Sequence, residues 1–469
     1  MRKVLFIYDD SIKPNQDIKS ITGKKSFGNT IFKRMSLKDR VKQRVCQIEF
    51  VDKFFDADDF KEDVIRSLTA DYSVFRMYSG YEILDIDKLS VLIEKSLFAQ
   101  ECYDIMCGEQ VVAVMYPGIN DYMVCSNKAS GANERIVSDA FVDLSDINNF
   151  RTFITSGFEA RFFNALKGDD YTVVKTSDNV WKLSREYNYF TLLPDEMKQY
   201  FATVYNYRET EGSASYTIER YHMTDLALRY VHGAISEEEF RAVMERLFHF
   251  ISIRKVRQVS DEEYSNNANE LYINKVEKRI EELKKLPQYE RIQKYIEQGT
   301  DYKDIDEIFA RYRTLYDRIS SPKRFMKVHV VGHGDLCFSN ILYNHDAALL
   351  KLIDPKGALE EDELYMNPYY DIAKLSHSVW GSYDYFNSDL YEIELDSNMK
   401  LKLRVDSDNE KYIKIFREYL AKNNIDENLV RLYEASLFLS MLPLHIDREK
   451  KVFGFVLNAI DILDELERA

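Results

Sequence analysis

The segment VHVVGHGDLCFSNILYN, residues 328–344, sets the strongest limit on how this chain folds. Two apolar runs with the composition of β-strands flank a polar loop that contains Asp335 and, five residues later, Asn340. Aspartate and asparagine are poor strand formers, so local folding preference does not explain their place here. A further run, ALLKLID, ends at Asp354, fourteen residues after Asn340. We therefore expect a strand, a loop and a β-hairpin that carry chemistry at their strand ends.

The size and composition of the chain are those of an ordinary globular protein. Its 469 residues exceed what one compact core accommodates, so we expect two or three domains. With 45% hydrophobic and 30% charged residues, the chain is expected to be ordered and fairly helical. The formal net charge of −15 makes nucleic acid and anionic membrane surfaces poor partners for the chain as a whole.

Cysteine use and apolar runs indicate a protein of the cytoplasm. The five cysteines form no CxxC pair and no zinc spacing with histidine, which is typical of reduced thiols. The N-terminal run VLFIY is too short for a signal peptide and predicts a first strand. The apolar run ASLFLSMLPL near the end is interrupted by serine and proline, so we expect no membrane insertion.

Residues 1–145 are predicted to form an α/β domain. The runs VLFIY and VVAVMY predict strands, and DIDKLSVLIEKSLFAQ predicts a helix with one apolar face. The first strand and the downstream FKRMSLKDRV faintly resemble a sugar nucleotidyltransferase, but the glycine-rich signature of that family is absent. Whether this domain is catalytic therefore stays open.

The rest of the chain is predicted to form two lobes. Residues 146–225 contain strand-like runs, among them YTVVKTS and SASYTIERY, and predict a small lobe rich in strands. Residues 226–469 predict mostly helix, with a charged helical insertion at about 254–325. One of these helices begins at a predicted capping box, Ser236 with Glu239.

Phosphoryl transfer from ATP requires few protein groups, and the polar loop supplies their types. A carboxylate must orient the acceptor hydroxyl, a lysine must hold the phosphates, and Mg²⁺ must bridge them. Mg²⁺ prefers hard oxygen ligands. An asparagine carbonyl and an aspartate carboxylate at neighbouring strand ends meet that need.

The segment HGDLCFSN followed by LKLID resembles the signature of the aminoglycoside phosphotransferase and choline kinase superfamily. That signature is His-Gly-Asp, four residues, Asn, and then a strand that ends in Ile-Asp. A second feature of the superfamily, an aspartate that opens a helix, is present as Asp371 in NPYYDIAKLSHS. The likeness covers about residues 150–469. It implies an α+β protein-kinase-like bilobal fold, with a small β-rich N-lobe and a mainly helical C-lobe, preceded by the α/β N-terminal domain.

The resemblance also implies roles for individual residues. Asp335 would be the catalytic base, or would orient the acceptor hydroxyl. Asn340 and Asp354 would be the ligands of Mg²⁺. His333 and Asp371 would brace the catalytic loop.

In the nucleotide-binding lobe the match is looser. Lys175, within an apolar strand, would hold the ATP phosphates, and Glu186, in a helix expected at about 181–201, would be its ion-pair partner. Lys175 could instead be a solvated lysine on an edge strand, and Glu186 could pair with Lys182. Glu219 would lie near the hinge that meets the adenine.

Two further segments leave alternatives open. The glycine-rich loop of the superfamily is represented only by Ser156 and Gly157, which would contact the nucleotide phosphates through hydroxyl and backbone groups. The aromatic stretch HSVWGSYDYF lines an acceptor pocket or belongs to the core. Cys337, inside the loop, is expected to serve packing.

We therefore expect an ATP- and Mg²⁺-dependent kinase that phosphorylates a hydroxyl of a small molecule such as a sugar, a polyol or an amino alcohol. By analogy, the extra N-terminal domain suggests synthesis of surface-glycan precursors such as those of capsular polysaccharide. A pseudokinase scaffold and a bifunctional kinase and nucleotidyltransferase are the alternatives. Neither the acceptor nor the choice between ATP and GTP can be read from the sequence.

Overall fold

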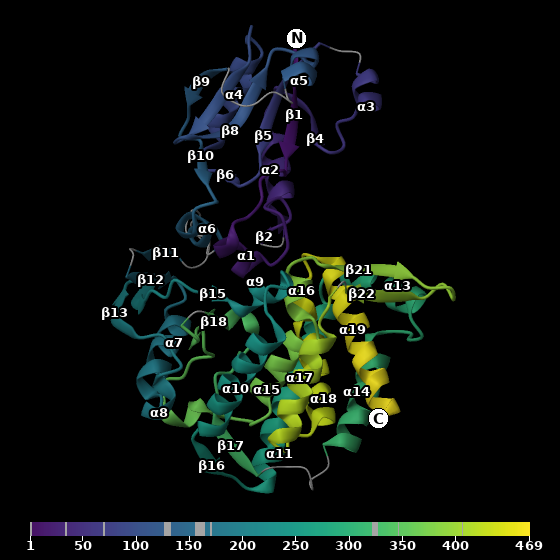
Figure 1. Ribbon diagram of the computed structural model, residues 1–469. Coiled ribbons are helices and arrows are strands. Elements are labelled where there is room, and N and C mark those ends of the chain that lie inside the picture. Colours follow the sequence, from purple (N-terminus) through teal and green to yellow (C-terminus); the bar gives the residue numbers. More distant parts are fainter. Residues whose placement is uncertain are drawn as a thin grey trace. The chain divides into compact units, whose positions relative to one another are not determined.

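A computed structural model of the chain describes residues 2–32, 35–68, 71–125, 133–154, 165–168, 171–320, 327–345, 347–405 and 407–469. Contacts between Cα atoms divide the chain into two units (Figure 1). The first contains residues 1–160 with 232–234, and the second contains 161–231 with 235–469. The N-lobe was expected to start at residue 146, but residues 146–160 group with the first unit, because helix α6 (Ile147–Ile154) packs there.

The first unit is built around a sheet of six strands with the order β4-β1-β5-β8-β7-β9. β1 is parallel to β4 and to β5, whereas β8 is antiparallel to both β5 and β7. The strands and helices are β1 (Lys3–Asp9), α1 (Gln16–Thr22), β2 (Ile31–Phe32), β3 (Met35–Ser36), α2 (Leu37–Val45), β4 (Val51–Asp56), α3 (Glu62–Arg66), β5 (Tyr72–Tyr78), β6 (Tyr81–Ile83), α4 (Ile86–Ser96), β7 (Tyr103–Cys107), β8 (Gln110–Tyr116), α5 (Ile119–Cys125), β9 (Glu134–Val137), β10 (Phe141–Asp143) and α6.

Alternation along β1 gives this sheet two apolar faces. Leu5 and Ile7 belong to one core cluster, together with Tyr122 of α5. Phe6, between them in sequence, points to the opposite face, where its ring stacks on that of Phe75 at 5.5 Å between centroids. The predicted strands VLFIY and VVAVMY are thus β1 and β8, and the predicted amphipathic helix is α4.

In the second unit, an antiparallel sheet with the order β11-β12-β14-β13 forms the smaller lobe, and helix α7 packs on it. Lys175 lies on β12, between β11 and β14, and faces Tyr216 across the strand pair. Lys175 is therefore on an interior strand, and the alternative of an edge-strand lysine is wrong. Helix α7 ends at Leu192 rather than near 201, because Pro194 follows and only the short α8 continues.

The elements of this lobe are β11 (Ala165–Gly168), β12 (Thr172–Ser177), α7 (Val180–Leu192), α8 (Asp195–Lys198), β13 (Val204–Thr210) and β14 (Ser213–Glu219). Those of the larger lobe are β15 (Thr224–Asp225), α9 (Leu226–Val231), α10 (Glu237–Ile253), β16 (Val256–Gln258), α11 (Asp261–Asn269), the π-helical η1 (Glu270–Asn274), α12 (Lys275–Lys284), α13 (Tyr289–Gly299), α14 (Ile305–Ile319), β17 (Val328–Val331), η3 (Phe338–Asn340), β18 (Ile341–Asn344), β19 (Leu349–Leu352), η4 (Glu361–Leu364), β20 (Tyr365–Met366), α15 (Tyr370–Val379), α16 (Tyr383–Asn387), β21 (Tyr391–Leu395), β22 (Leu401–Val405), α17 (Glu410–Lys422), α18 (Glu427–Met441), η5 (Leu442–His445) and α19 (Glu449–Arg468).

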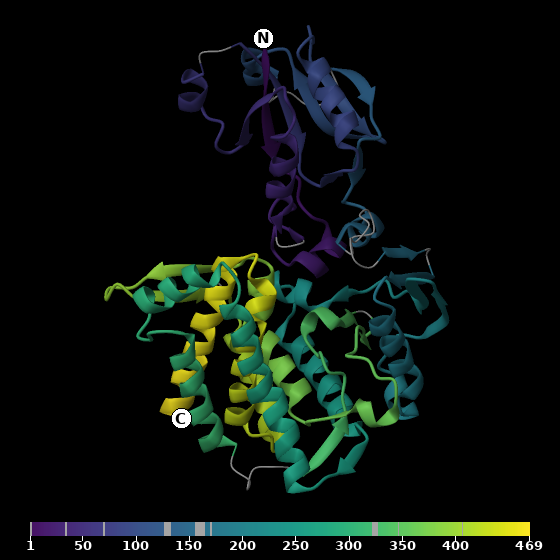
Figure 2. The same cartoon turned by 180° about the vertical axis from the view of Figure 1, so that it is seen from behind.

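The larger lobe is mainly helical, as expected. Helices α18 and α19 run side by side, and α15 packs on α18 (Figure 1). The green segment that carries β17, β18 and β19 lies between the teal smaller lobe and the yellow-green C-terminal helices in the view from behind (Figure 2). β18 and β19 form the predicted hairpin, with Ile341 opposite Leu352. The catalytic-loop motif therefore connects β17 to the first strand of this hairpin.

The capping box predicted for α10 is only half formed. The backbone N–H of Glu239 donates to the Ser236 hydroxyl at 3.1 Å, as a cap requires. The Glu239 carboxylate, however, pairs with the buried guanidinium of Arg229, with 3.0 Å between Nη2 and Oε2. A buried guanidinium is the stronger partner for this carboxylate, so the box prediction is wrong for its second half.

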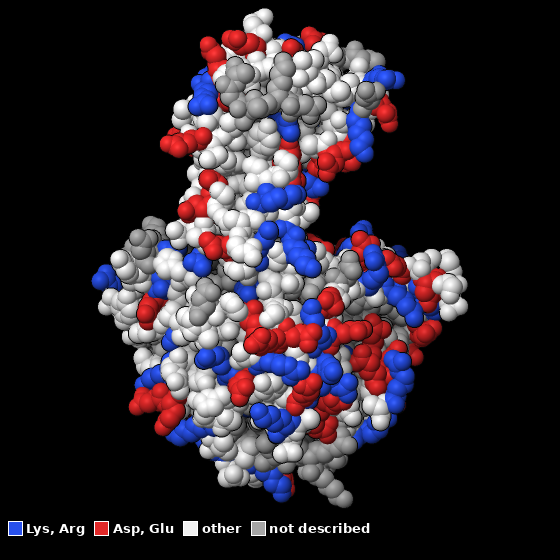
Figure 3. Space-filling view, in the orientation of Figure 1, with Lys and Arg blue, Asp and Glu red and all other residues white. Residues whose placement is uncertain are grey.

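One face of the second unit and the described helices bear on the expected partners. On the face in Figure 3, acidic and basic side chains are interspersed over the second unit rather than gathered into one basic patch. None of the helices in the described ranges has the length and apolar character needed to cross a bilayer.

Candidate active site

The predicted catalytic loop, between β17 and β18, is held by one buried carboxylate. Asp371, at the start of α15, accepts the backbone N–H groups of His333 and Gly334 at 2.9 and 2.8 Å. Arg254 supplies the charge partner, 3.4 Å from Asp371. Gly334 has φ +81°, and a Cβ there would lie 2.5 Å from that of Lys356, so both conformation and space require glycine.

His333 links the loop to the end of the hairpin. Its Nε2 lies 2.9 Å from the carbonyl oxygen of Ile353, and its Nδ1 accepts the N–H of Asp335 at 3.2 Å. These contacts assign the proton to Nε2. Burial holds the pKa of His333 below its usual value, so the ring is neutral. Its ring also stacks on that of Phe201, and it contacts the loop backbone rather than open solvent.

Asp335 stands at the point where the loop opens to solvent, and its side chain is 43% exposed. Asn340 donates from its amide to a carboxylate oxygen of Asp335 at 3.1 Å and to its carbonyl at 2.9 Å. Lys374 of α15 approaches the other carboxylate oxygen at 2.9 Å. Burial favours the neutral acid, but the charge of Lys374 outweighs it and lowers the pKa of Asp335. The carboxylate is therefore ionised and able to accept a hydroxyl proton.

The second cluster of charges joins the two lobes of this unit. Lys175 Nζ lies 2.6 Å from Oε2 of Glu186 on α7 and 2.9 Å from Oδ1 of Asp354 beyond β19. Lys182, the alternative partner of Glu186, is farther away at 3.9 Å and is mostly exposed. Burial would lower the pKa of Lys175, but Asp354 and Glu186 raise it, so the ammonium group stays charged.

Asp354 has the features of a metal ligand. Its backbone is in the left-handed region with φ +54°, which a non-glycine residue adopts at a cost. Its side chain is 51% exposed. The amide nitrogen of Asn340 donates to Asp335, so the amide oxygen is the atom of Asn340 that would bind a metal ion. These hard oxygen donors fit Mg²⁺, which takes few protein ligands and fills its other positions with phosphate oxygens and water. In the described part of the chain, no group of three or more His, Cys, Asp or Glu side chains is arranged for a metal ion.

Of the remaining predicted site residues that the structure describes, Glu219 is not part of these clusters. Ser156 and Gly157 lie outside the described residues. Glu219, at the end of β14, is exposed, and its carboxylate accepts from the hydroxyl of Tyr221 at 2.7 Å. Cys337 is buried, and burial raises the pKa of its thiol to about 12, which suits a packing role.

Sequence reasoning missed Lys374 and Arg254, which contact Asp335 and Asp371. A signal existed for Lys374, because it is the only Lys, Arg, Asp or Glu after Asp371 in a helix whose other positions, apart from His377, are apolar or serine. A lysine in such a helix needs a buried partner. Arg254 ends α10 and carried no comparable signal.

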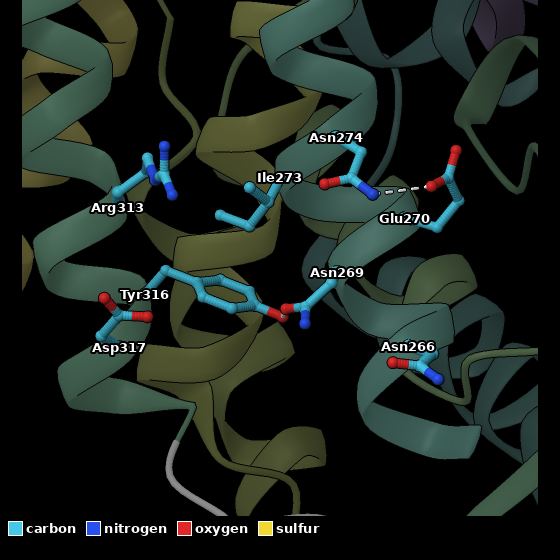
Figure 4. Close-up of a pocket in the computed structure, with 8 residues that line it drawn as sticks. All are labelled: Asn266, Asn269, Glu270, Ile273, Asn274, Arg313, Tyr316 and Asp317. Atoms are coloured by element: carbon cyan, nitrogen blue, oxygen red, sulfur yellow. Dashed lines mark hydrogen bonds between the residues drawn. The ribbon is translucent and has the colours of Figure 1, made fainter. Parts of the chain in front are cut away.

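A separate polar pocket of about 470 Å³ lies between α11, η1 and α14 (Figure 4). Asn269 and Tyr316 meet there, with 3.0 Å between the amide oxygen and the hydroxyl, and Glu270 accepts from Asn274 at 2.8 Å. Its lining shares no residue with the two charge clusters described above.

Comparison with solved structures finds similar chains. The chain is similar to solved aminoglycoside phosphotransferases. One is an aminoglycoside-3'-phosphotransferase of type VIII, with 14% identity, 59% of this chain and 88% of that chain covered, and a TM-score of 0.35. Another is a thermostable mutant of the aminoglycoside phosphotransferase APH(4)-Ia with ADP and hygromycin B, with 10% identity, 68% and 97% covered, and a TM-score of 0.37.

A third similar structure is described as a fructosamine-3-kinase from Haemophilus somnus, with 10% identity, 66% and 88% covered, and a TM-score of 0.38. No family model matches the chain, and no curated protein matches it. At these identities the functional argument rests on the contacts of the site.

Proposed function

We propose that the second unit is a kinase of the aminoglycoside phosphotransferase type, which transfers the γ-phosphoryl group of ATP to a hydroxyl of a small molecule. The observation that carries this is the paired contact of Lys175 with Glu186 and Asp354. It connects a strand of the smaller lobe to the end of the hairpin that follows the catalytic loop. The lysine that would bind phosphate and the aspartate that would bind the metal ion therefore lie side by side, as phosphoryl transfer requires.

Each residue of the site has a separate proposed role. Lys175, released from Asp354 when nucleotide binds, contacts the phosphates, while Glu186 keeps its ammonium group in place. Asn340 and Asp354 would hold Mg²⁺, which neutralises phosphate charge when bound. Asp335 accepts the proton of the acceptor hydroxyl as that oxygen attacks the γ-phosphorus, and the bond to the β-phosphate oxygen breaks. Most of the rate enhancement then comes from positioning and charge, with no covalent enzyme intermediate.

The test is ATP consumption with a panel of sugars, polyols, amino alcohols and hydroxy acids. The matched control is Asp335→Asn, which removes the charged base but keeps the shape of the side chain. We expect turnover to fall by about a hundredfold or more, while Mg²⁺-ATP still raises the unfolding temperature. Asp354→Ala should instead lose the Mg²⁺-dependent part of that stabilisation. Wild-type turnover by Asp335→Asn would refute the role of the base.

The finer expectations remain proposals. We place the enzyme in the cytoplasm and, by analogy alone, in the synthesis of surface-glycan precursors. Among the described residues, no observation favours the pseudokinase or an active N-terminal nucleotidyltransferase.

In the first unit, the aspartates at the end of β1 are engaged within the protein. Asp9 pairs with Arg76, and Asp10 accepts from Ser26 and from the backbone of Gly28. Stabilisation of the first unit by CTP or UTP would favour the bifunctional alternative.

A further inference from the structure

Helix α15 presents one face to the catalytic loop. Tyr370, Lys374 and His377 are spaced by four and three residues, so they share that face. The next residue, Ser378, accepts the backbone N–H of Phe338 at 3.0 Å, which holds the helix against the loop. The helix is therefore held beside the loop, and Lys374 and Tyr370 of this face lie near Asp335, where the proposed acceptor hydroxyl binds.

The group nearest to the base is a cation. Lys374 is 14% exposed and its ammonium lies 2.9 Å from the carboxylate of Asp335. Burial would lower the pKa of Lys374, but Asp335 and the hydroxyl of Tyr370 raise it above its usual value. When Asp335 takes up the acceptor proton, its charge is lost and this ammonium group loses its partner. A mostly buried charge without a partner is costly, so an anion that binds beside Lys374 would stabilise this state.

A second lysine, Lys275, contacts Tyr370, which is on the same helix as Lys374. Lys275, at the start of α12, is 3.3 Å from the hydroxyl of Tyr370 and 5.6 Å from the centre of its ring. Burial tends to raise the pKa of Tyr370, yet the charges of Lys374 and Lys275 lower it. Two ammonium groups thus act on one phenol at the side of the catalytic loop.

The same region contains a histidine with no hydrogen-bond partner. His377 is fully buried, its ring stacks on Tyr383 at 4.1 Å, and neither ring nitrogen is bonded within the described structure. Burial, followed by the charges of Lys374 and Lys451, holds its pKa well below the usual value. Lys451 is itself fully buried and donates to the amide oxygen of Asn387 at 2.5 Å. The helix face is therefore in a field of positive charge.

Asp371, Asp384 and Asp335 are aspartates near this face, and they differ in charge and in partners. Asp371 is taken up by two backbone N–H groups and by Arg254. Asp384 is buried, and burial raises its pKa to about 7, so it is substantially protonated at neutral pH. Asp335 is the ionised carboxylate that faces Lys374, and it is neutralised during the reaction.

We propose that the acceptor is an anionic hydroxy compound, whose carboxylate or phosphate group binds Lys374 and Lys275 while its hydroxyl faces Asp335. This inference rests on the proposed kinase function. The acceptor oxygen bonds to the γ-phosphorus, its proton goes to Asp335, and ADP leaves with the electron pair of the broken bond. Lys374 then exchanges the carboxylate of Asp335 for the anion of the acceptor. A cationic acceptor, such as an amino sugar or a quaternary amine, would instead meet two ammonium groups of like charge.

The experiment compares acceptors that differ in charge but share a skeleton. One set is glycerol, D-glycerate and glycerol 3-phosphate, and the other is glucose, glucuronate, glucose 6-phosphate and glucosamine. The rate of ADP formation gives kcat/KM for each, and thermal shift in Mg²⁺-ADP gives binding where turnover is absent. We expect the acidic members to be preferred by at least about tenfold, and the carboxylate and phosphate members show which anion is used.

Variants then test the lysines. Lys374→Met and Lys275→Met should raise KM for the acidic acceptor and erase the preference over the neutral member of the same set. Lys278→Met is the matched control, because Lys278 is on the same helix as Lys275 but is exposed. It should leave both constants unchanged. If Lys374 only positions Asp335, its variant lowers kcat equally for neutral and acidic members, and the proposal falls.

The outcomes separate the acceptor from the activity. A preference for the neutral or the cationic member, with Asp335→Asn inactive, overturns the anionic acceptor and leaves the kinase standing. Mg²⁺-ATP binding without stabilisation by any acidic member overturns it as well. Absence of both ATP binding and turnover removes the kinase, and the inference with it.

Discussion

At the scale of single residues, removing a charged side chain of the second unit should cost more stability where its partner is buried than where its partner is exposed. Lys175 has two carboxylate partners, and both it and Glu186 are buried. Lys182 also lies near Glu186 but is exposed to water. Because a charge left alone in the interior costs far more than one left alone in water, the two lysines should differ in effect.

Lys175→Met should lower the free energy of unfolding by about 3–5 kcal/mol, because the buried Glu186 carboxylate keeps only the Tyr216 hydroxyl at 3.2 Å and the exposed Lys182 at 3.9 Å. It should also abolish turnover. Lys182→Met, its matched control, should change stability by less than about 0.5 kcal/mol. Urea denaturation of the two variants measures the difference. Equal effects would show that Lys175 is not the main partner of Glu186.

Asp384 gives the clearest dependence on pH. Its pKa is raised from 3.8 to about 7, so the folded state keeps a proton that the unfolded state has lost between these values. Wild-type stability from this group is therefore present at low pH and is lost as the pH rises towards 7. Asp384→Asn has no such loss, and its advantage over wild type should grow by about 4 kcal/mol between pH 4 and pH 8. Denaturation of both proteins at pH 4 and pH 8 tests this. A stability difference that stays constant with pH would contradict a raised pKa for Asp384.

At the scale of elements, two helices begin with the same pattern but use it differently. Ser236 and Ser260 each accept the N–H of the glutamate three residues later, at 3.1 and 3.0 Å. The carboxylate of Glu239 is buried against Arg229, whereas that of Glu263 is mostly exposed. The sequence pattern is therefore equal at the two sites, but the tertiary surroundings are not.

Ser236→Ala and Ser260→Ala should each cost about 1 kcal/mol, which is the usual value of a lost N-cap. Glu239→Ala should cost about 3–5 kcal/mol, because Arg229 is left buried without its carboxylate. Glu263→Ala should cost less than about 1 kcal/mol. The four variants are compared by chemical denaturation, and a small loss for Glu239→Ala would mean that Arg229 has another sufficient partner.

At the scale of the whole molecule, the two units have separate cores and separate sheets. Among the described residues, those proposed to bind the nucleotide and its metal, Lys175, Asn340 and Asp354, belong to the second unit. A ligand that binds only the native form stabilises the region that it contacts, by about 2.7 kcal/mol at a hundred times its dissociation constant. Nucleotide binding should therefore be visible in one unit and not in the other.

Mg²⁺-ATP should slow backbone hydrogen exchange in β12, in β14 and in the segment from β17 to Asp354. The strands β1 and β5 of the first unit should exchange as before. ATP with a chelator in place of Mg²⁺ should give less protection, because Asp354 then lacks the metal that links it to the phosphates. Protection of β1 by ATP would point to a nucleotide site in the first unit.

Several features were predictable because they depend on residues that are close in sequence. The loop with Asp335 and Asn340 and the hairpin that leads to Asp354 were predicted from residue type and spacing, whereas the pairing of Lys175 with Glu186 was implied by the family resemblance. Strand alternation and N-caps were readable for the same reason, because they are set by neighbours within a few residues.

Tertiary structure alone decided which distant charges meet. It brought Lys374 to Asp335, Arg254 to Asp371, and Lys275 to Tyr370, and it turned Glu239 away from its own helix cap. These contacts join different elements, and the register between packed helices and loops is set by the shape of the whole core. Local pattern carries the residues proposed for phosphoryl transfer, whereas the charge around the proposed acceptor site follows from how the helices pack.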